Sequence, residues 1–133
     1  MQHLTHKTQK DLEKSNKIIL VVEDDNSIGS ILVDILSQET SYHVLLVTDA
    51  FQAMRVLRTI RPSLFMTDYL LPQMNGIALY DHLCATNDLK HVPTIVMSAY
   101  LPEDEVKKRQ LIGINKPFEL DELLDTVEKL LED

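Results

Sequence analysis

The sequence has little of several residue types on which common binding sites depend. Among its 133 residues there are one cysteine, Cys84, no tryptophan and three glycines, Gly29, Gly76 and Gly113. A single cysteine excludes a disulfide within the chain and is typical of a reducing compartment, so we expect a cytoplasmic protein. The three glycines are too far apart to form the glycine-rich turns that bind nucleotides, which excludes that class of site.

Positive charge is scarce as well. Lysine and arginine number 13 against 21 aspartate and glutamate residues, which gives a net charge of −8. Such an acidic chain is poorly suited to nucleic-acid binding, because that binding depends on neutralising phosphates. No apolar run approaches the roughly 20 residues that a membrane-spanning helix needs. We therefore expect neither direct nucleic-acid binding nor membrane insertion. The length of the chain suits one domain.

The composition divides the chain into a tail and one domain. Residues 1–16 are polar, carry mixed charge and show little apolar periodicity, so they predict a loose N-terminal extension, with a short helix over residues 9–14 as the alternative. They do not resemble a secretory signal. Residues 17–133 contain the apolar segments and are predicted to form the domain.

In that domain, short apolar runs alternate with segments of helical periodicity. The first run, Ile18–Val22, is continuous and rich in β-branched residues, as in a strand buried on both faces. Further strands are predicted over Ser63–Thr67 and three other ranges: His43–Val47, Pro93–Met97 and Leu111–Asn115. Five helices alternate with these strands, and the last is predicted over residues 119–132. The alternation predicts an α/β fold with a parallel sheet covered by helices on both faces.

Polar residues lie at the starts of the predicted helices and within one of them. Asp25 or Asn26 is suited to cap the first helix, and Asp49 and Asn75 are suited to cap the second and third. The fourth helix begins near Pro102 and contains one clearly apolar residue, Val106, so we expect it to be short or irregular.

Charged and hydroxyl side chains follow four of the five predicted strands. Glu23, Asp24 and Asp25 follow the first strand, and single residues follow the third, fourth and fifth: Asp68, Ser98 and Lys116. The carboxyl ends of parallel strands meet at one edge of the sheet, where ligands bind in open α/β folds. The sequence therefore predicts a polar site at this edge.

Three carboxylates at one edge need positive charge among them. Each pair of like charges costs about 4 kcal/mol at ~4 Å and an effective dielectric constant of ~20. Lys116 supplies one positive charge. A bound Mg²⁺ ion would supply two, since Mg²⁺ prefers oxygen ligands and leaves room for phosphate oxygens. The five histidines show no metal-ligand spacing. Helix capping explains Asp25 alone, whereas it does not explain why the other acids share this edge with Lys116.

Four motifs in order resemble the receiver domain of two-component response regulators, over about residues 17–132. They are I-L-V-V-E-D-D, F-M-T-D-Y-L-L-P-Q-M-N-G, P-T-I-V-M-S-A and N-K-P-F. The separations from Asp24 to Asp68 and from Asp68 to Ser98 also fit that family. The resemblance implies a flavodoxin-like, doubly wound sheet of five parallel strands in the order 2-1-3-4-5.

The resemblance also implies a role for each residue at the edge of the sheet. Asp68 is expected to be the phosphoacceptor, a carboxylate nucleophile that attacks the phosphorus of a partner's phosphohistidine. Ser98 is expected to donate a hydrogen bond to a phosphoryl oxygen, and Lys116 to pair first with Asp68 and then with the phosphoryl group. A cis Lys116–Pro117 peptide bond is typical of such domains.

For the metal, the resemblance implies a Mg²⁺ site. Its expected ligands are Asp24, Asp68 and the backbone carbonyl of Leu70, with Glu23 acting through a water molecule. Mg²⁺ is the one cofactor expected.

The function implied is a phosphoryl-accepting switch in a two-component or phosphorelay pathway, without an attached output domain. The expected partners are a sensor histidine kinase or a histidine phosphotransfer protein, and a downstream protein. The chain is not expected to be an enzyme beyond assisting its own phosphorylation and dephosphorylation, and monomer and weak dimer both stay open. One alternative is a receiver-like interaction module that acts independently of phosphorylation. The other, a Mg²⁺-dependent phosphatase, lacks the D-x-D arrangement at Asp68.

The chain departs from the family between Ser98 and Lys116. This stretch is about one helical turn shorter than usual, and Gly113 stands where an aromatic residue is usual. We therefore expect the phosphotransfer chemistry to be retained and the surface that contacts partners to be rebuilt. Leu70 and Tyr100 flank the predicted site and neither readily activates water, which predicts slow loss of the phosphoryl group.

Overall fold

Five parallel strands form one sheet in the order β2-β1-β3-β4-β5, which confirms the predicted topology. The computed structural model describes residues 17–132, so the predicted N-terminal extension lies outside the described residues. The strands are β1 (Ile18–Val22), β2 (His43–Val47), β3 (Leu64–Asp68), β4 (Thr94–Ser98) and β5 (Ile112–Asn115).

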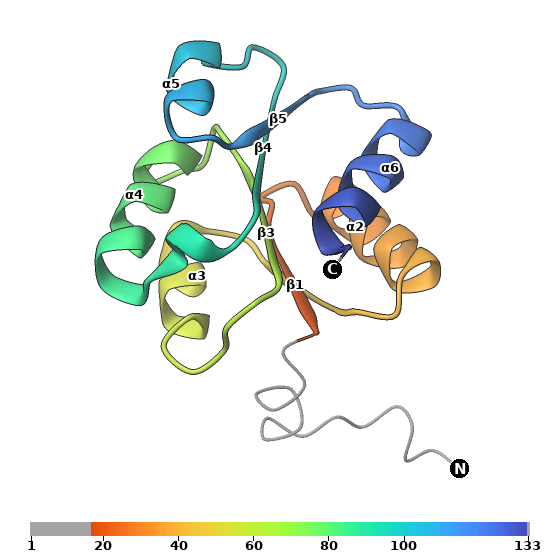
Figure 1. Ribbon diagram of the computed structural model, residues 1–133, viewed down its shortest axis with the longest axis horizontal. Helices are drawn as coiled ribbons and strands as arrows, with labels where there is room; N and C mark the ends of the chain where they lie inside the picture. The colour runs from red at the N-terminus through yellow and green to blue at the C-terminus, as the bar shows by residue number, and fades with distance from the viewer. Residues whose placement is uncertain (1–16, 133) are drawn as a thin grey trace.

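Helices cover both faces of the sheet (Figure 1). Two of them, α2 (Asn26–Glu39) and α6 (Leu120–Leu131), lie on one face. The other face carries α3 (Ala50–Val56), α4 (Gly76–Asn87) and α5 (Glu103–Lys108), and a short 3₁₀ turn, η2 (Leu89–His91), follows α4. Each helix connects two strands that are consecutive in the sequence or follows the last strand, and the connection through α3 crosses β1 to join β2 to β3.

Two apolar clusters hold these layers together, one on each face of the sheet. Ile19 and Val21 pack in one cluster with residues of α2 and α6, including Leu32 and Leu123. The alternate β1 residues, such as Leu20, pack in the other cluster with residues of α3 and α4. Every side chain of β1 is buried, because successive residues of a strand point to opposite faces and both faces are covered. The continuous apolar run in the sequence follows from this arrangement.

Capping side chains set where three of the helices begin, as predicted. The Asp25 carboxylate accepts hydrogen bonds from the backbone N–H groups of Ser27 and Ile28, at 2.9 and 3.1 Å. Asp49 caps α3 and Asn75 caps α4 in the same way. Each cap lies in the loop that leaves the carboxyl end of a strand, so these loops are fixed close to the edge where the acidic residues lie.

The ends of two strands correct the predicted ranges. β3 and β4 each begin and end one residue later than predicted, so Asp68 and Ser98 are the last residues of strands rather than the first residues of loops. Both remain in the ladder, because Asp68 pairs with Met97 and Ser98 pairs with Asn115. Pro93 lies just outside β4, in keeping with its missing backbone N–H. β5 likewise begins one residue late.

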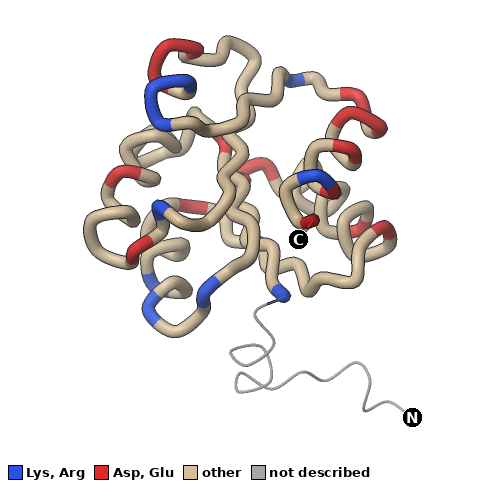
Figure 2. The backbone as a smooth tube through the Cα atoms, in the orientation of Figure 1, with Lys and Arg blue, Asp and Glu red and all other residues tan. Residues whose placement is uncertain are grey.

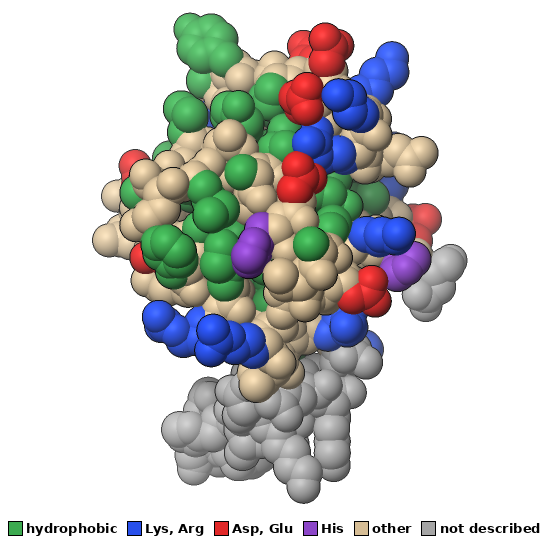
Figure 3. Space-filling view, turned by 90° about the vertical axis from the view of Figure 1, so that its left-hand side faces the viewer, with side chains coloured by type: hydrophobic (Ala, Val, Ile, Leu, Met, Phe, Trp, Pro, Cys, Tyr) green, Lys and Arg blue, Asp and Glu red, His purple; other side chains and the backbone are tan. Residues whose placement is uncertain are grey.

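The helix α5 is short, as predicted, and buries one side chain, Val106. Arg109, directly after it, joins it to α4 through two hydrogen bonds of 2.7 and 2.8 Å to the Asp81 carboxylate. A third hydrogen bond of 2.7 Å runs from Arg109 to Glu105 within α5. Figure 3 shows this mixture of acidic and basic side chains near the top of the α3–α4–α5 face. Ion pairs therefore supplement a small apolar contact.

Acidic residues predominate along α6, as its red segments in Figure 2 show, and Asp121, Glu122, Asp125 and Glu128 are exposed. The inner surface of this helix buries Leu123 and Val127. Within residues 17–132, no helix is both long enough and apolar enough to cross a membrane.

Candidate functional site

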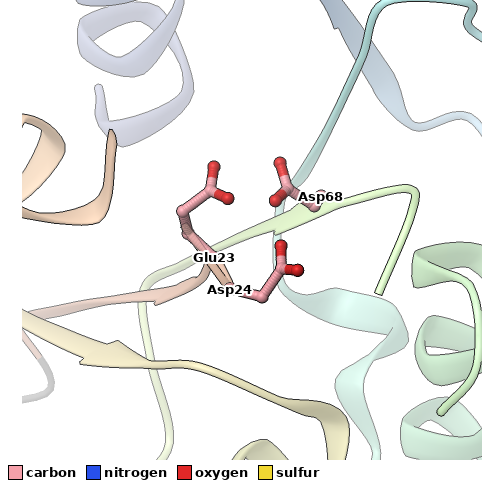
Figure 4. Close-up of side chains that lie close together, drawn as sticks. All are labelled: Glu23, Asp24 and Asp68. Carbon is pink, nitrogen blue, oxygen red and sulfur yellow. The ribbon is translucent and has the colours of Figure 1, made fainter. Parts of the chain in front are cut away.

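Three carboxyl groups meet at the edge of the sheet where β1 and β3 end (Figure 4). One oxygen atom from each of Glu23, Asp24 and Asp68 lies within 4.8 Å of the other two. Glu23 is 1% exposed and Asp68 is 3% exposed, whereas Asp24 faces solvent. The grouping arises because β1 and β3 are neighbours in register, with Val22 beside Thr67.

Hydrogen bonds hold both carboxylate oxygens of Glu23 in place. One oxygen, Oε2, accepts from the backbone N–H of Asp25 at 3.1 Å, and the other, Oε1, accepts from the ammonium of Lys116 at 2.9 Å. Burial acts to raise the pKa of Glu23, but the contacts with Asp68 and Lys116 outweigh it and the pKa lies below its usual value. Glu23 therefore carries negative charge in a buried position.

Asp68 is the carboxyl group whose ionisation is most altered. Burial raises its pKa to about 8, with the Glu23 carboxyl acting in the same direction and Lys116 against it. The ammonium Nζ of Lys116 lies 2.6 Å from Oδ1 of Asp68. This contact is an ion pair without hydrogen-bond geometry, so Oδ1 is buried without a hydrogen-bond donor among the described residues. One buried oxygen of Asp68 therefore has the Lys116 ammonium beside it and no hydrogen-bond donor among the described residues.

Lys116 balances both buried acids. It follows β5, and its backbone N–H donates to the carbonyl of Ser98 at 3.0 Å, which fixes the lysine beside the end of β4. Burial acts to lower the pKa of Lys116, but the contacts with Asp68 and Glu23 raise it above its usual value. The Lys116–Pro117 peptide bond is cis, as the family resemblance led us to expect.

All six predicted site residues line one cavity of about 340 Å³: Glu23, Asp24, Asp68, Leu70, Ser98 and Lys116. The hydroxyl of Ser98 donates a hydrogen bond to the carbonyl of Tyr100 at 3.2 Å and accepts one from the Tyr100 N–H at 3.1 Å. Leu70 lies in the loop after β3 with its side chain 73% exposed. The role of its carbonyl group as a metal ligand stays a prediction.

The donor atoms of this site fit a hard divalent cation. The three clustered residues offer oxygen atoms only, and one of these, Oδ1 of Asp68, is buried without a hydrogen-bond donor. Mg²⁺ prefers carboxylate oxygen and keeps several water molecules, which a cavity with one exposed acid, Asp24, can accommodate.

Two features of the site were not predicted from the sequence. Lys116 was expected to pair with Asp68 alone, whereas its ammonium is shared with Glu23. No role was predicted for the backbone of Tyr100, which holds the Ser98 hydroxyl. A run of three strand-end residues predicts proximity to Lys116 but does not predict which carboxylate the ammonium contacts.

Comparison with known proteins identifies relatives over nearly all of the described chain. The family model described as "Response regulator receiver domain" matches residues 19–128. The chain is 28% identical over 120 residues to sporulation initiation phosphotransferase F of Bacillus subtilis, covering 87% of this chain and 94% of that protein. It is 27% identical to the polar-differentiation response regulator DivK of Brucella anthropi, covering 88% of this chain and 98% of that protein.

A solved structure shows the same arrangement of strands and helices. The signal receiver domain of a signal transduction histidine kinase from Syntrophus aciditrophicus superimposes with a TM-score of 0.74 and is 33% identical in sequence. The superposition covers 86% of this chain and 89% of that domain.

Proposed function

This chain belongs to the response regulator receiver domain family of two-component and phosphorelay signalling, and from that premise we propose that it is a phosphoryl-accepting switch with Asp68 as the acceptor. Members of this family typically act as signalling switches rather than as enzymes. The observation that carries the proposal is the Oδ1 atom of Asp68. It is buried, lacks a hydrogen-bond donor among the described residues and lies 2.6 Å from the Lys116 ammonium.

The proposed step is an attack of an Asp68 carboxylate oxygen on the phosphorus of a partner's phosphohistidine. The new phosphorus–oxygen bond forms as the phosphorus–nitrogen bond breaks, and the imidazole leaves with the electron pair. Phosphoryl transfer depends mainly on positioning and on neutralisation of charge. Lys116 brings a positive charge and Ser98 brings a hydroxyl donor to the same cavity, so both can stabilise the phosphoryl oxygens.

We propose that Mg²⁺ binds at Asp24, Asp68 and the backbone carbonyl of Leu70, with Glu23 acting through water. When bound, the cation would neutralise charge on the transferring group and the acceptor. The clustering of the three carboxyl groups within 4.8 Å supports this assignment.

The proposed phosphoryl donor is a histidine kinase or a histidine phosphotransfer protein, and the proposed output is binding to another protein. Two relatives support this: one is named as a phosphotransferase of sporulation initiation, and the other is the receiver domain of a histidine kinase. The cytoplasmic location stays a prediction from cysteine content.

Phosphorylation can be tested directly by intact mass after incubation with Mg²⁺ and acetyl phosphate. We expect a mass gain of one phosphoryl group in the unmodified protein and no gain in Asp68→Asn, which keeps the shape of the side chain but removes the nucleophilic carboxylate. Excess EDTA should also prevent the gain, because the cation site would be empty.

Asp24→Asn and Asp34→Asn form a matched pair of controls. Asp24 belongs to the carboxylate cluster, whereas Asp34 is an exposed residue of α2, so phosphorylation should be impaired in the first variant and unchanged in the second. No mass gain in a folded protein that still binds Mg²⁺ would favour an interaction module that acts independently of phosphorylation.

The phosphoryl group, once attached, is expected to be lost slowly. Leu70 is 73% exposed at the cavity and offers no polar side-chain atom to hold an attacking water. Leu70→Asn would supply such an atom without altering the backbone carbonyl, and we expect it to shorten the half-life about tenfold or less, since positioning one water is a modest effect. Intact mass followed over time after removal of acetyl phosphate measures both half-lives. Equal half-lives would contradict the expectation.

A further inference from the structure

The side chain of Leu101 lies where a side chain at Gly113 would be. Leu101 belongs to the loop between β4 and α5, and Gly113 belongs to β5. A Cβ atom at Gly113 would lie 2.9 Å from Cδ1 of Leu101 and 3.3 Å from Cδ2. Leu101 is half-buried and packs against the apolar cluster of the α3–α4 face, so its position is fixed by contacts on more than one side. The missing side chain of Gly113 thus makes room for Leu101.

The residue before Leu101 holds the hydroxyl group of Ser98. The Ser98 Oγ atom donates to the carbonyl of Tyr100 at 3.2 Å and accepts from its N–H at 3.1 Å. Tyr100 is 90% exposed, so packing of its side chain does not hold the loop. The neighbouring Leu101 packs over Gly113 and against the apolar cluster, and these contacts hold the backbone next to Tyr100.

A serine hydroxyl has one hydrogen to donate. Ser98 lines the same cavity as Asp68, where the proposed phosphoryl group would arrive. When Ser98 donates to a phosphoryl oxygen, its hydrogen bond to the Tyr100 carbonyl is lost. The cost of that loss depends on how firmly the loop is held, because a mobile carbonyl can find water as a replacement donor.

We propose that Leu101 is a positioning residue for Ser98, with the space over Gly113 as the site that holds it. In the resting protein, contact with Gly113 keeps the Tyr100 backbone in place and the Ser98 hydroxyl directed toward it. Binding of a phosphoryl oxygen by Ser98 releases the Tyr100 carbonyl and draws Leu101 away from Gly113. The proposal rests on the proposed function and deepens it, since it assigns the change to the surface between α5 and β5.

The surface between α5 and β5 contains a cavity in the resting protein. A cavity of about 460 Å³ is lined by Leu101, Val106 and Gly113 and by charged residues of α5. Displacement of Leu101 would enlarge its apolar floor next to a helix that buries only Val106. The surface between α5 and β5 would therefore change on phosphorylation through the contact between Leu101 and Gly113.

Gly113→Ala tests this coupling. The new methyl group would meet the end of a flexible side chain at 2.9 Å, so Leu101 can move aside without a change in the backbone of β5. The measurement is the affinity of the full-length protein for beryllium fluoride, a mimic of the phosphoryl group on a carboxylate, at saturating Mg²⁺ by fluorine NMR. We expect binding about three- to tenfold tighter, the equivalent of one weakened hydrogen bond. Leu101→Ala should act in the same direction.

Two controls distinguish the proposed coupling from a general structural effect of the added methyl group. Gly29→Ala places a methyl group 2.8 Å from the end of Leu46, on the α2 face of the sheet, and should leave the affinity unchanged. In the Ser98→Ala background, Gly113→Ala should no longer alter the affinity, because the hydroxyl through which Leu101 acts is gone.

The outcomes distinguish this inference from the proposed function. If the unmodified protein binds the mimic but Gly113→Ala and Leu101→Ala bind it equally well, the role of Leu101 is overturned and the proposed function stands. The role is also overturned if Gly113→Ala has the same effect with and without Ser98. If the unmodified protein does not bind, or Asp68→Asn binds as well, the proposed function fails and the inference fails with it.

Discussion

Replacing Lys116 with methionine should lower the free energy of unfolding by about 2–4 kcal/mol at pH 7 in EDTA, because the buried, ionised Glu23 carboxylate loses its counter-charge. The ammonium lies 2.9 Å from Glu23 and 2.6 Å from Asp68, and the lysine side chain is 23% exposed. Methionine preserves most of the side-chain volume, so the loss is electrostatic. Urea denaturation with and without Mg²⁺ measures it, and the cation should restore much of the stability.

The pH dependence of this variant has a defined sign. The pKa of Asp68 is about 8 in the folded protein, above that of an unfolded aspartate at ~3.9, and removal of Lys116 would raise it further. The folded state therefore holds a proton that the unfolded chain releases. The contribution of Asp68 to the stability of this variant is therefore greatest below about pH 4. It falls as the pH rises toward and beyond 8. The stability lost through Lys116→Met should accordingly be larger at pH 8 than at pH 5.

Lys108→Met is the matched control. Lys108 is also paired with an acid, since its ammonium lies 3.7 Å from Glu105, but its side chain is 68% exposed. Exposed ion pairs contribute little, so the change should stay within about 0.5 kcal/mol and be insensitive to Mg²⁺. Equal stability of Lys116→Met and Lys108→Met in EDTA would show that Lys116 does not balance the buried acids.

Gly76→Ala is expected to lower the free energy of unfolding by about 3 kcal/mol or more, because the new methyl group has no space. Gly76 is the first residue of α4, and a Cβ atom there would overlap the carbonyl oxygen of Asp68. It would also lie 3.1 Å from Cγ2 of Thr67. Both neighbours are buried residues of β3, and the Gly76 N–H already donates to the Tyr69 carbonyl at 2.6 Å. Urea denaturation monitored by circular dichroism measures the loss.

The other two glycines provide controls for this variant. Alanine at Gly29 or Gly113 meets the ends of the flexible side chains of Leu46 and Leu101 rather than a backbone atom. Their rotation can relieve the contact, so each variant should lose about 1 kcal/mol or less. Similar losses in all three variants would contradict the steric argument. Phosphorylation should also be impaired in Gly76→Ala alone, because the displaced atoms belong to Asp68.

The fold follows from local features that the sequence displays. Continuous apolar runs such as Ile18–Val22 predict buried strands, and Asp25, Asp49 and Asn75 predict where helices begin. Each of these signals involves residues within a few positions of each other, so no knowledge of tertiary contacts is needed. The same is true of the short α5, whose sequence offers one clearly apolar side chain.

Contacts between segments that lie far apart in the sequence could not be predicted from it. The ladder extends one residue further than predicted at Asp68 and Ser98, because pairing with neighbouring strands overrides the polar character of those residues. Arg109 contacts Asp81 across 28 positions, and Leu101 fills a space that exists only because β5 carries Gly113. Side-chain packing of this kind depends on three-dimensional distances that residue spacing does not encode.

The ion pairs of Arg109 have a consequence for local unfolding. A helix of six residues gains little from its own hydrogen bonds, and α5 is attached to the domain by Val106 and by charges that salt can screen. The strands β1 and β4 are buried on both faces and do not share this dependence. Ionic strength therefore acts selectively: amide protons of α5 would exchange with solvent through openings that leave the sheet and the carboxylate cluster intact.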